Sequence, residues 1–133
     1  MHLQPQDIDS LAEFFNGAYY CSKEAIRDAV ERQSIFNIID HTSGFKADFV
    51  IRKNNTYRLA EFARRKKMNF YGTEIYVVSV EDLLISKLIW IQQWQAAVQI
   101  EDIKNLLLLP DLDSGYMRQW IAELNLNTFN LMP

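Results

Sequence analysis

The carboxylate of Asp48 is the side chain of this sequence that most directly suggests chemistry. It lies in a short run of aromatic and aliphatic residues that predicts a β-strand. Strand side chains alternate with a period of two, so Asp48 shares one face with Lys46 while Ala47 and Phe49 share the other. A carboxylate in mid-strand can hold a divalent cation, or it can pair with a cation such as Lys46 or Lys87.

Asp7 and Asp9 form an Asp-x-Asp pair, which is the arrangement that two metal ligands take on a strand. On a helix the two side chains would diverge by about 200°. Pro5 precedes the pair and an apolar spacing of three to four follows it, so we interpret both acids as part of a first helical turn. Asp40 stands beside His41, and we interpret that pair as part of a polar turn.

Basic residues are concentrated in one segment although the whole chain is slightly acidic. The net charge is −3, yet eight of the 14 basic residues fall between Lys46 and Lys67. Arg64-Arg65-Lys66-Lys67 is predicted to close a helix, where cations are stabilised by the negative end of the helix dipole. Contact with a nucleotide or a nucleic acid is the alternative, and it would be sensitive to salt.

Composition limits the class of protein. The chain has 133 residues, of which 49% are hydrophobic and 23% charged, so we expect a single folded domain over residues 1–133. It contains one cysteine and no apolar run long enough for a membrane span. Its first residues lack the pattern of a secretory signal. We therefore expect a cytoplasmic protein without membrane or nucleic-acid partners.

The hydrophobic pattern predicts a mixture of helices and strands. The spacing of apolar residues favours helices and a β-hairpin in the first half, then a second strand pair and three helices. Trp90, Trp94 and Trp120 lie on helical apolar stripes and are expected in the core. The predicted fold class is α/β of the α+β type, with a small antiparallel or mixed sheet, flanking helices and a helical C-terminal portion. Ser22 is expected to cap the helix that begins at residue 23, and Ser79-x-x-Asp82 has the spacing of a capping box at the start of the helix over 80–94. The expected helices are 8–15, 23–30, 56–66, 80–94, 100–107 and 117–124, and the expected strands are 18–21, 35–40, 45–52, 68–70 and 74–78.

Several segments in a fixed order resemble a known family. They are Ser34–Ile39, Ser43–Phe49, Phe62–Arg65, Ser79–Leu88 and Glu101–Ile103. Together they are similar to small bacterial nucleotidyltransferase-like proteins of the polymerase-beta-type superfamily, a group related to the toxins of abortive-infection toxin–antitoxin systems. The resemblance runs from about Pro5 to Leu109.

The resemblance implies a specific chemistry. Members transfer a nucleoside monophosphate with two divalent metals about 4 Å apart, held by three carboxylates. Asp48 matches the third carboxylate and is the predicted catalytic residue and metal ligand, with Mg²⁺ as the implied cofactor. Lys46 and Lys87 are the predicted nucleotide-binding residues, although Lys87 could instead be a salt-bridged lysine, with Asp102 as its partner.

The sequence departs from the family at its start. It has no Gly-Gly or Gly-Ser turn followed by an Asp-x-Asp strand, so it resembles an N-terminally shortened member. We therefore predict a nucleotidyltransferase-like protein that is inactive as it stands, with ATP or GTP as a possible ligand. One alternative is an active Mg²⁺-dependent enzyme that uses Asp48 with Asp7, Asp9 or Asp40 and acts on protein, RNA or a small molecule. Another is a structural homodimer or interaction module that pairs through an open sheet edge or an apolar helix face.

Overall fold

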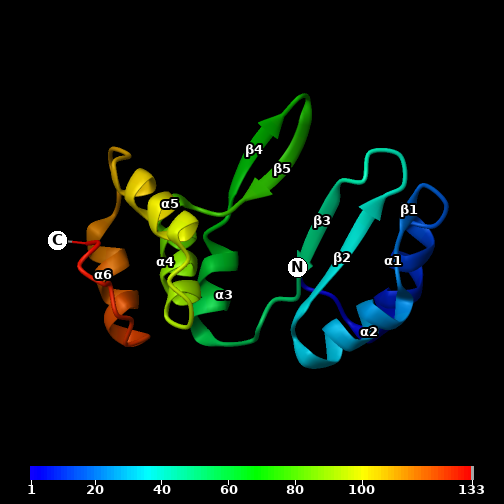
Figure 1. Ribbon diagram of the computed structural model, residues 1–133, viewed down its shortest axis with the longest axis horizontal. Coiled ribbons are helices and arrows are strands. Elements are labelled where there is room, and N and C mark those ends of the chain that lie inside the picture. Colours follow the sequence, from blue (N-terminus) through cyan, green and yellow to red (C-terminus); the bar gives the residue numbers. More distant parts are fainter. Residues whose placement is uncertain (133) are drawn as a thin grey trace. The chain divides into compact units, whose positions relative to one another are not determined.

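A computed structural model describes residues 1–132 of the chain. The chain forms two compact units, the first comprising Met1–Arg58 and the second beginning at Leu59. The boundary falls within helix α3 (Thr56–Ala63). Each unit has its own sheet and its own helices, as Figure 1 shows. That the two units act as a single domain stays a prediction.

The first unit combines two helices with a three-stranded sheet. Ser22 caps the second helix because its Oγ accepts a hydrogen bond of 3.2 Å from the Ala25 amide. Gln33 ends that helix in the left-handed conformation, at φ 50°. The elements in chain order are η1 (Pro5–Asp7), α1 (Ile8–Phe14), β1 (Tyr19–Tyr20), α2 (Lys23–Arg32), β2 (Ile35–Asp40) and β3 (Lys46–Val50).

The predicted hairpin is confirmed as β2 and β3, which pair antiparallel with Asn37 opposite Asp48. The face of the sheet that carries Phe36 and Ile38 packs against α1 and α2 (Figure 1) and forms the core of this unit. Phe36 and Phe49 stack on that face with ring centroids 5.1 Å apart. The apolar side chains of one sheet face therefore hold the sheet to its helices, and Phe49 lies on the face opposite Lys46 and Asp48, as the period-two pattern predicted.

The opposite face of the same sheet is exposed. Ile35 is 58% exposed and Val50, its cross-strand neighbour, is 50% exposed. Lys46 and Asp48 belong to this face, since residues alternate along β3. The candidate carboxylate therefore lies on the sheet face opposite the helices α1 and α2.

Helix α3 is shorter than the sequence predicted. It ends at Ala63, and Lys66 already begins strand β4 (Lys66–Phe70), which pairs antiparallel with β5 (Thr73–Val77). The sequence has no glycine or proline between residues 57 and 71 to mark this change. Residues from Lys66 onward instead pair with β5, across the turn at Tyr71 and Gly72. The interpretation of Lys66 and Lys67 as the last turn of a helix was therefore wrong.

Three helices complete the second unit: α4 (Val80–Ile91), α5 (Ala97–Leu107) and α6 (Ser114–Glu123). Their core is formed by side chains with almost no exposed surface, namely Leu84, Ile85, Leu88, Ile91, Ile103 and Met117. Trp120 is buried as predicted, whereas Trp90 and Trp94 are exposed by 51% and 78%. Helix α4 ends at Ile91, so Trp94 lies beyond the helical stripe that was expected to bury it.

The α+β fold class is confirmed, with helices and two separate antiparallel sheets. Within residues 1–132, no helix is both long enough and apolar enough to span a bilayer.

Candidate functional site

Asp48 lies in the middle of β3 with its carboxylate in solvent. Its Oδ1 is 3.4 Å from the Lys46 Nζ, and both side chains are 54% exposed. An exposed ion pair of this kind contributes little to stability, so either partner can leave it at small cost to engage a ligand. The structure thus brings together two of the predicted site residues, a carboxylate and an ammonium group, on one exposed strand face.

The other acids weighed as metal ligands have local structural roles. The Asp7 Oδ2 accepts a hydrogen bond of 2.9 Å from the Gln4 amide, in the short helix η1. Asp9, in the first turn of α1, forms an ion pair of 2.6 Å with Lys23, and this contact holds the pKa of Asp9 below its ordinary value. The helical interpretation of both residues is confirmed.

Asp40 closes the β2–β3 turn. Its Oδ1 accepts from the Thr42 amide at 2.8 Å, and its Oδ2 accepts from the Ser43 hydroxyl at 2.8 Å. These hydrogen bonds favour the charged form and lower the pKa of Asp40. Within residues 1–132, no group of three or more His, Cys, Asp or Glu side chains is arranged to hold a metal ion.

Lys87 lies in the second unit, on α4, where it forms a specific pair of contacts. Its Nζ donates hydrogen bonds of 2.8 Å to the Gln99 Oε1 and 2.7 Å to the Asp102 Oδ2, both on α5. The Lys87 side chain is only 11% exposed. The salt bridge to Asp102, one of the two interpretations of Lys87, is thus present and ties α4 to α5. A role of Lys87 in binding a nucleotide stays a prediction.

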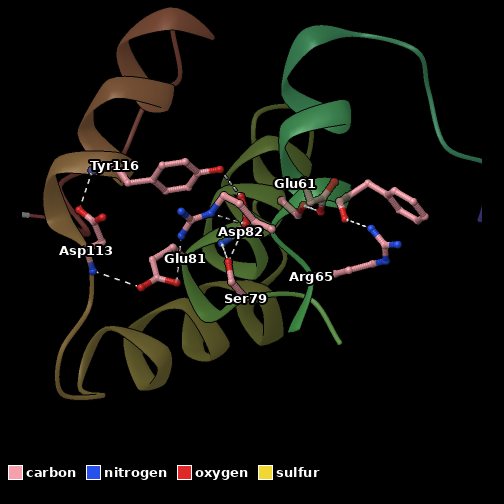
Figure 2. Close-up of polar contacts among 10 residues, drawn as sticks. Glu61, Arg65, Ser79, Glu81, Asp82, Asp113 and Tyr116 are labelled. Carbon is pink, nitrogen blue, oxygen red and sulfur yellow. Dashed lines mark hydrogen bonds and ion pairs between the residues drawn. The ribbon is translucent and has the colours of Figure 1, made fainter. Parts of the chain in front are cut away.

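The most extensive polar network of the second unit surrounds Asp82 (Figure 2). Asp82 is fully buried near the start of α4. Its Oδ2 accepts hydrogen bonds from the Ser79 hydroxyl at 2.6 Å and the Arg64 Nε at 3.3 Å, while its Oδ1 accepts from the Tyr116 hydroxyl at 2.7 Å. We call these residues, with Glu81 and Asp113, the Asp82 cluster.

Glu81 and Asp113 extend the network to the start of α6. The Glu81 Oε1 accepts from the Asp113 amide at 3.1 Å, and Asp113 caps α6 by accepting from the Tyr116 amide at 2.9 Å. Burial acts to raise the pKa of Glu81. Hydrogen bonds from its own amide and that of Asp113, with the positive charges of Arg64 and Lys66, outweigh burial and lower it.

Tyr116 and Arg64 also contact each other directly. The Arg64 guanidinium carbon lies 3.8 Å from the centroid of the Tyr116 ring, which is a cation–π contact. Burial, and then the hydrogen bond to Asp82, raise the pKa of the Tyr116 hydroxyl. Because Asp82 is enclosed by donors from three parts of the unit, the cluster is suited to hold α4 and α6 together with the segment after α3.

No family model, curated protein or solved structure matches this chain. The resemblance to nucleotidyltransferases therefore stays an expectation from the sequence segments alone.

Part of the Asp82 cluster could be read from the sequence and part could not. The Ser79-x-x-Asp82 spacing predicted a helix start, and the Ser79 Oγ does accept from the Asp82 amide at 3.1 Å. Arg64 and Tyr116 are 18 and 34 positions away from Asp82. No local pattern signals such distant partners, so sequence reasoning missed them.

Proposed function

We propose that this chain is a nucleotidyltransferase-like protein that binds a nucleoside triphosphate through Mg²⁺ without itself completing nucleotidyl transfer. Asp48 would hold the metal, and Lys46 would contact the triphosphate. The observation that carries the proposal is the exposed Asp48–Lys46 pair in the middle of a strand, on the sheet face opposite the helices. The sequence segments that resemble the family support the same assignment.

The contrast between Asp48 and the other acids of the first unit supports the choice of ligand. Asp7 and Asp40 accept hydrogen bonds from backbone amides and so stabilise η1 and the β2–β3 turn, and a metal ion would compete with those contacts. Asp9 pairs with Lys23 in a first helical turn, away from the strand face of Asp48. Asp48 pairs with Lys46, an exposed lysine that can move with the nucleotide.

One carboxylate is enough to bind a Mg²⁺–nucleotide, because Mg²⁺ is commonly held by one or two carboxylates together with substrate phosphates. A two-metal displacement needs more converging carboxylates than Asp48 alone. The proposal is therefore binding without transfer. The active enzyme, in which further acids join Asp48, is the alternative that the experiment must separate.

Calorimetric titration of the purified chain with ATP and with GTP tests the proposal, with and without Mg²⁺. We expect binding that requires Mg²⁺ and is lost in Asp48→Asn. Asp28→Asn is the matched control, because Asp28 is also an exposed acid of the first unit paired with a nearby cation, at 2.8 Å from Arg32. Binding that is absent, or equal in both variants, contradicts the proposal.

A pyrophosphate assay on the same samples separates binding from transfer. We expect no release of pyrophosphate from bound ATP or GTP by the wild-type chain. Release that stops in Asp48→Asn would instead establish the active enzyme.

The apolar part of the same sheet face favours a second candidate function, a homodimer or interaction module. Ile35, Val50 and Tyr20 are each at least half exposed on this face. Sedimentation at several protein concentrations tests pairing with a second copy. This candidate predicts a dimer that Ile35→Lys disrupts, and a monomer at every concentration would exclude the homodimer.

A further inference from the structure

The hairpin of β4 and β5 projects away from helices α3 and α4 of its own unit (Figure 1). Four of its large apolar and aromatic side chains are more than half exposed. The exposed fractions are 51% for Met68, 56% for Phe70, 93% for Tyr71 and 54% for Tyr76. A ribbon of two strands is only marginally stable in water. Aromatic side chains that remain in solvent do not stabilise it by packing, so their exposure calls for another explanation.

The backbone at the tip of the hairpin adopts an unfavourable conformation at Tyr71, whose ring is exposed. Tyr71 and Gly72 both have positive φ, 47° and 83°, as in a type I′ turn. Asn and Gly suit these positions, whereas a bulky side chain there is unfavourable. The Tyr71 ring makes a T-shaped contact with the ring of its neighbour Phe70, at 4.6 Å between centroids, and Tyr71 is still 93% exposed. A strained residue that leaves its ring in solvent points to a function at the tip.

Cations lie at the base of the same ribbon. The Arg65 guanidinium is 4.0 Å from the Phe62 ring and 4.6 Å from the Tyr76 ring. The Lys67 Nζ is 5.6 Å from the Tyr76 ring and 2.7 Å from the Glu74 Oε1. Lys66 is exposed on the strand itself. The sequence predicted that these cations close a helix and are stabilised by its dipole. Lys66 and Lys67 lie in a strand instead, so the helix dipole does not explain their presence.

We propose that the β4–β5 hairpin binds single-stranded nucleic acid. Phe70 and Lys66 lie on one face of the ribbon, Tyr76 and Lys67 lie on the other, and Tyr71 stands at the tip between them. A single strand that passes over the tip would stack its bases on these rings, and Arg65, Lys66 and Lys67 would contact its phosphates. Proteins that bind single strands combine these two features, exposed aromatic rings and adjacent cations. Residues 65–77 carry three cations and one acid, Glu74, so an apolar protein partner that covered the rings would leave the net positive charge of this segment unmatched. The net charge of −3 argued against nucleic acid for the chain as a whole, but this surface is locally basic.

Fluorescence anisotropy with labelled oligouridylate and oligothymidylate of about 12 nucleotides tests the proposal. We expect the chain to bind at least one of them, and a duplex of equal length more weakly. Three phosphate contacts predict a slope of about −2 for the logarithm of the association constant against the logarithm of salt concentration. The affinity should therefore fall about 20-fold between about 50 and 200 mM NaCl.

Tyr71→Asn is the decisive variant, because Asn suits the turn and keeps the hairpin folded while the ring is lost. We expect it to weaken binding about fivefold or more, since stacking contributes about 1 to 3 kcal/mol per base. Trp94→Ala is the matched control, as it removes another highly exposed ring of the same unit. Lys66→Gln should lower both the affinity and the salt slope, whereas Lys104→Gln on α5 should change neither.

Several results would overturn the proposal. Absence of binding at low salt would do so, as would affinity that is unchanged in Tyr71→Asn or equally reduced in Trp94→Ala. Self-association that Tyr71→Asn abolishes, without oligonucleotide binding, would assign the hairpin to contact between copies instead. Asp48→Asn should leave oligonucleotide binding unchanged, so this test and the test of nucleotide binding can fail separately.

Discussion

Removal of the Tyr116 hydroxyl tests whether the Asp82 cluster holds the second unit together. The Tyr116→Phe variant keeps the ring, and with it the contact to Arg64, but removes the donor that lies 2.7 Å from the Asp82 Oδ1. A hydrogen bond to a charged group contributes about 1.5 to 3 kcal/mol, and Asp82 is fully buried, so water cannot readily replace the lost donor. We therefore expect the free energy of unfolding to fall by about 2 kcal/mol.

Urea denaturation followed by tryptophan fluorescence measures this change selectively. All three tryptophans, Trp90, Trp94 and Trp120, belong to the second unit, so their emission reports its unfolding. A loss of about 2 kcal/mol moves the midpoint by about 1 to 2 M urea. Tyr71→Phe is the control, because it removes a hydroxyl from a side chain that is 93% exposed, and its midpoint should not move.

A double-mutant cycle with Asp82→Asn shows whether the effect passes through the hydrogen bond. If the Tyr116 hydroxyl acts on Asp82, the two changes should couple by about 0.5 to 3 kcal/mol. A fall of less than about 0.5 kcal/mol for Tyr116→Phe alone, or additive losses in the double variant, would refute the assignment of Asp82 as the centre of the cluster.

Three further predictions concern stability. Because folding lowers the pKa of Glu81, the contribution of Glu81 to the free energy of unfolding should be complete above its ordinary pKa of 4.5 and should be lost as the pH falls through the lower folded pKa. Urea midpoints measured from about pH 6 to about pH 3 should therefore decline less for Glu81→Gln than for wild type, and equal declines would contradict this prediction. Phe36→Ala should destabilise the first unit by about 3 to 5 kcal/mol, seen as faster amide exchange in β2, and unchanged exchange would show that Phe36 is not a core residue. Lys87→Met should lower stability by less than about 1.5 kcal/mol, because its partner Asp102 is 44% exposed and can be hydrated; a larger loss of urea stability would mean that the pair supports more than the α4–α5 contact.

Local patterns predicted the elements that local forces determine. Ser22 and Ser79 were identified as helix starts from their side chains alone, and both do cap their helices. Two β-rich runs joined by a short turn predicted the hairpin, and the period of two correctly placed Phe49 on the face opposite Asp48. In each case the residues that decide the structure are close together in the sequence.

The errors had different causes. The strand that begins at Lys66 pairs with β5, but the sequence before it has no glycine or proline to end the helical pattern, which was therefore extended too far. Trp94 was assigned to the core from its spacing, but α4 ends three residues before it. The Asp82 cluster joins residues from three separate segments, and only the Ser79–Asp82 part leaves a pattern in the sequence.

The position of bound metal is the most direct test of the proposed nucleotide site. Mn²⁺ can replace Mg²⁺ at oxygen ligands and broadens the NMR signals of nearby amides, so amide spectra recorded with Mn²⁺ and ATP locate the ion. We predict broadening centred on Asp48 and on Asn37, its cross-strand neighbour, that disappears in Asp48→Asn and persists in Asp28→Asn. Broadening centred elsewhere, or an unchanged pattern in Asp48→Asn, would contradict the assignment of this strand face as the nucleotide site.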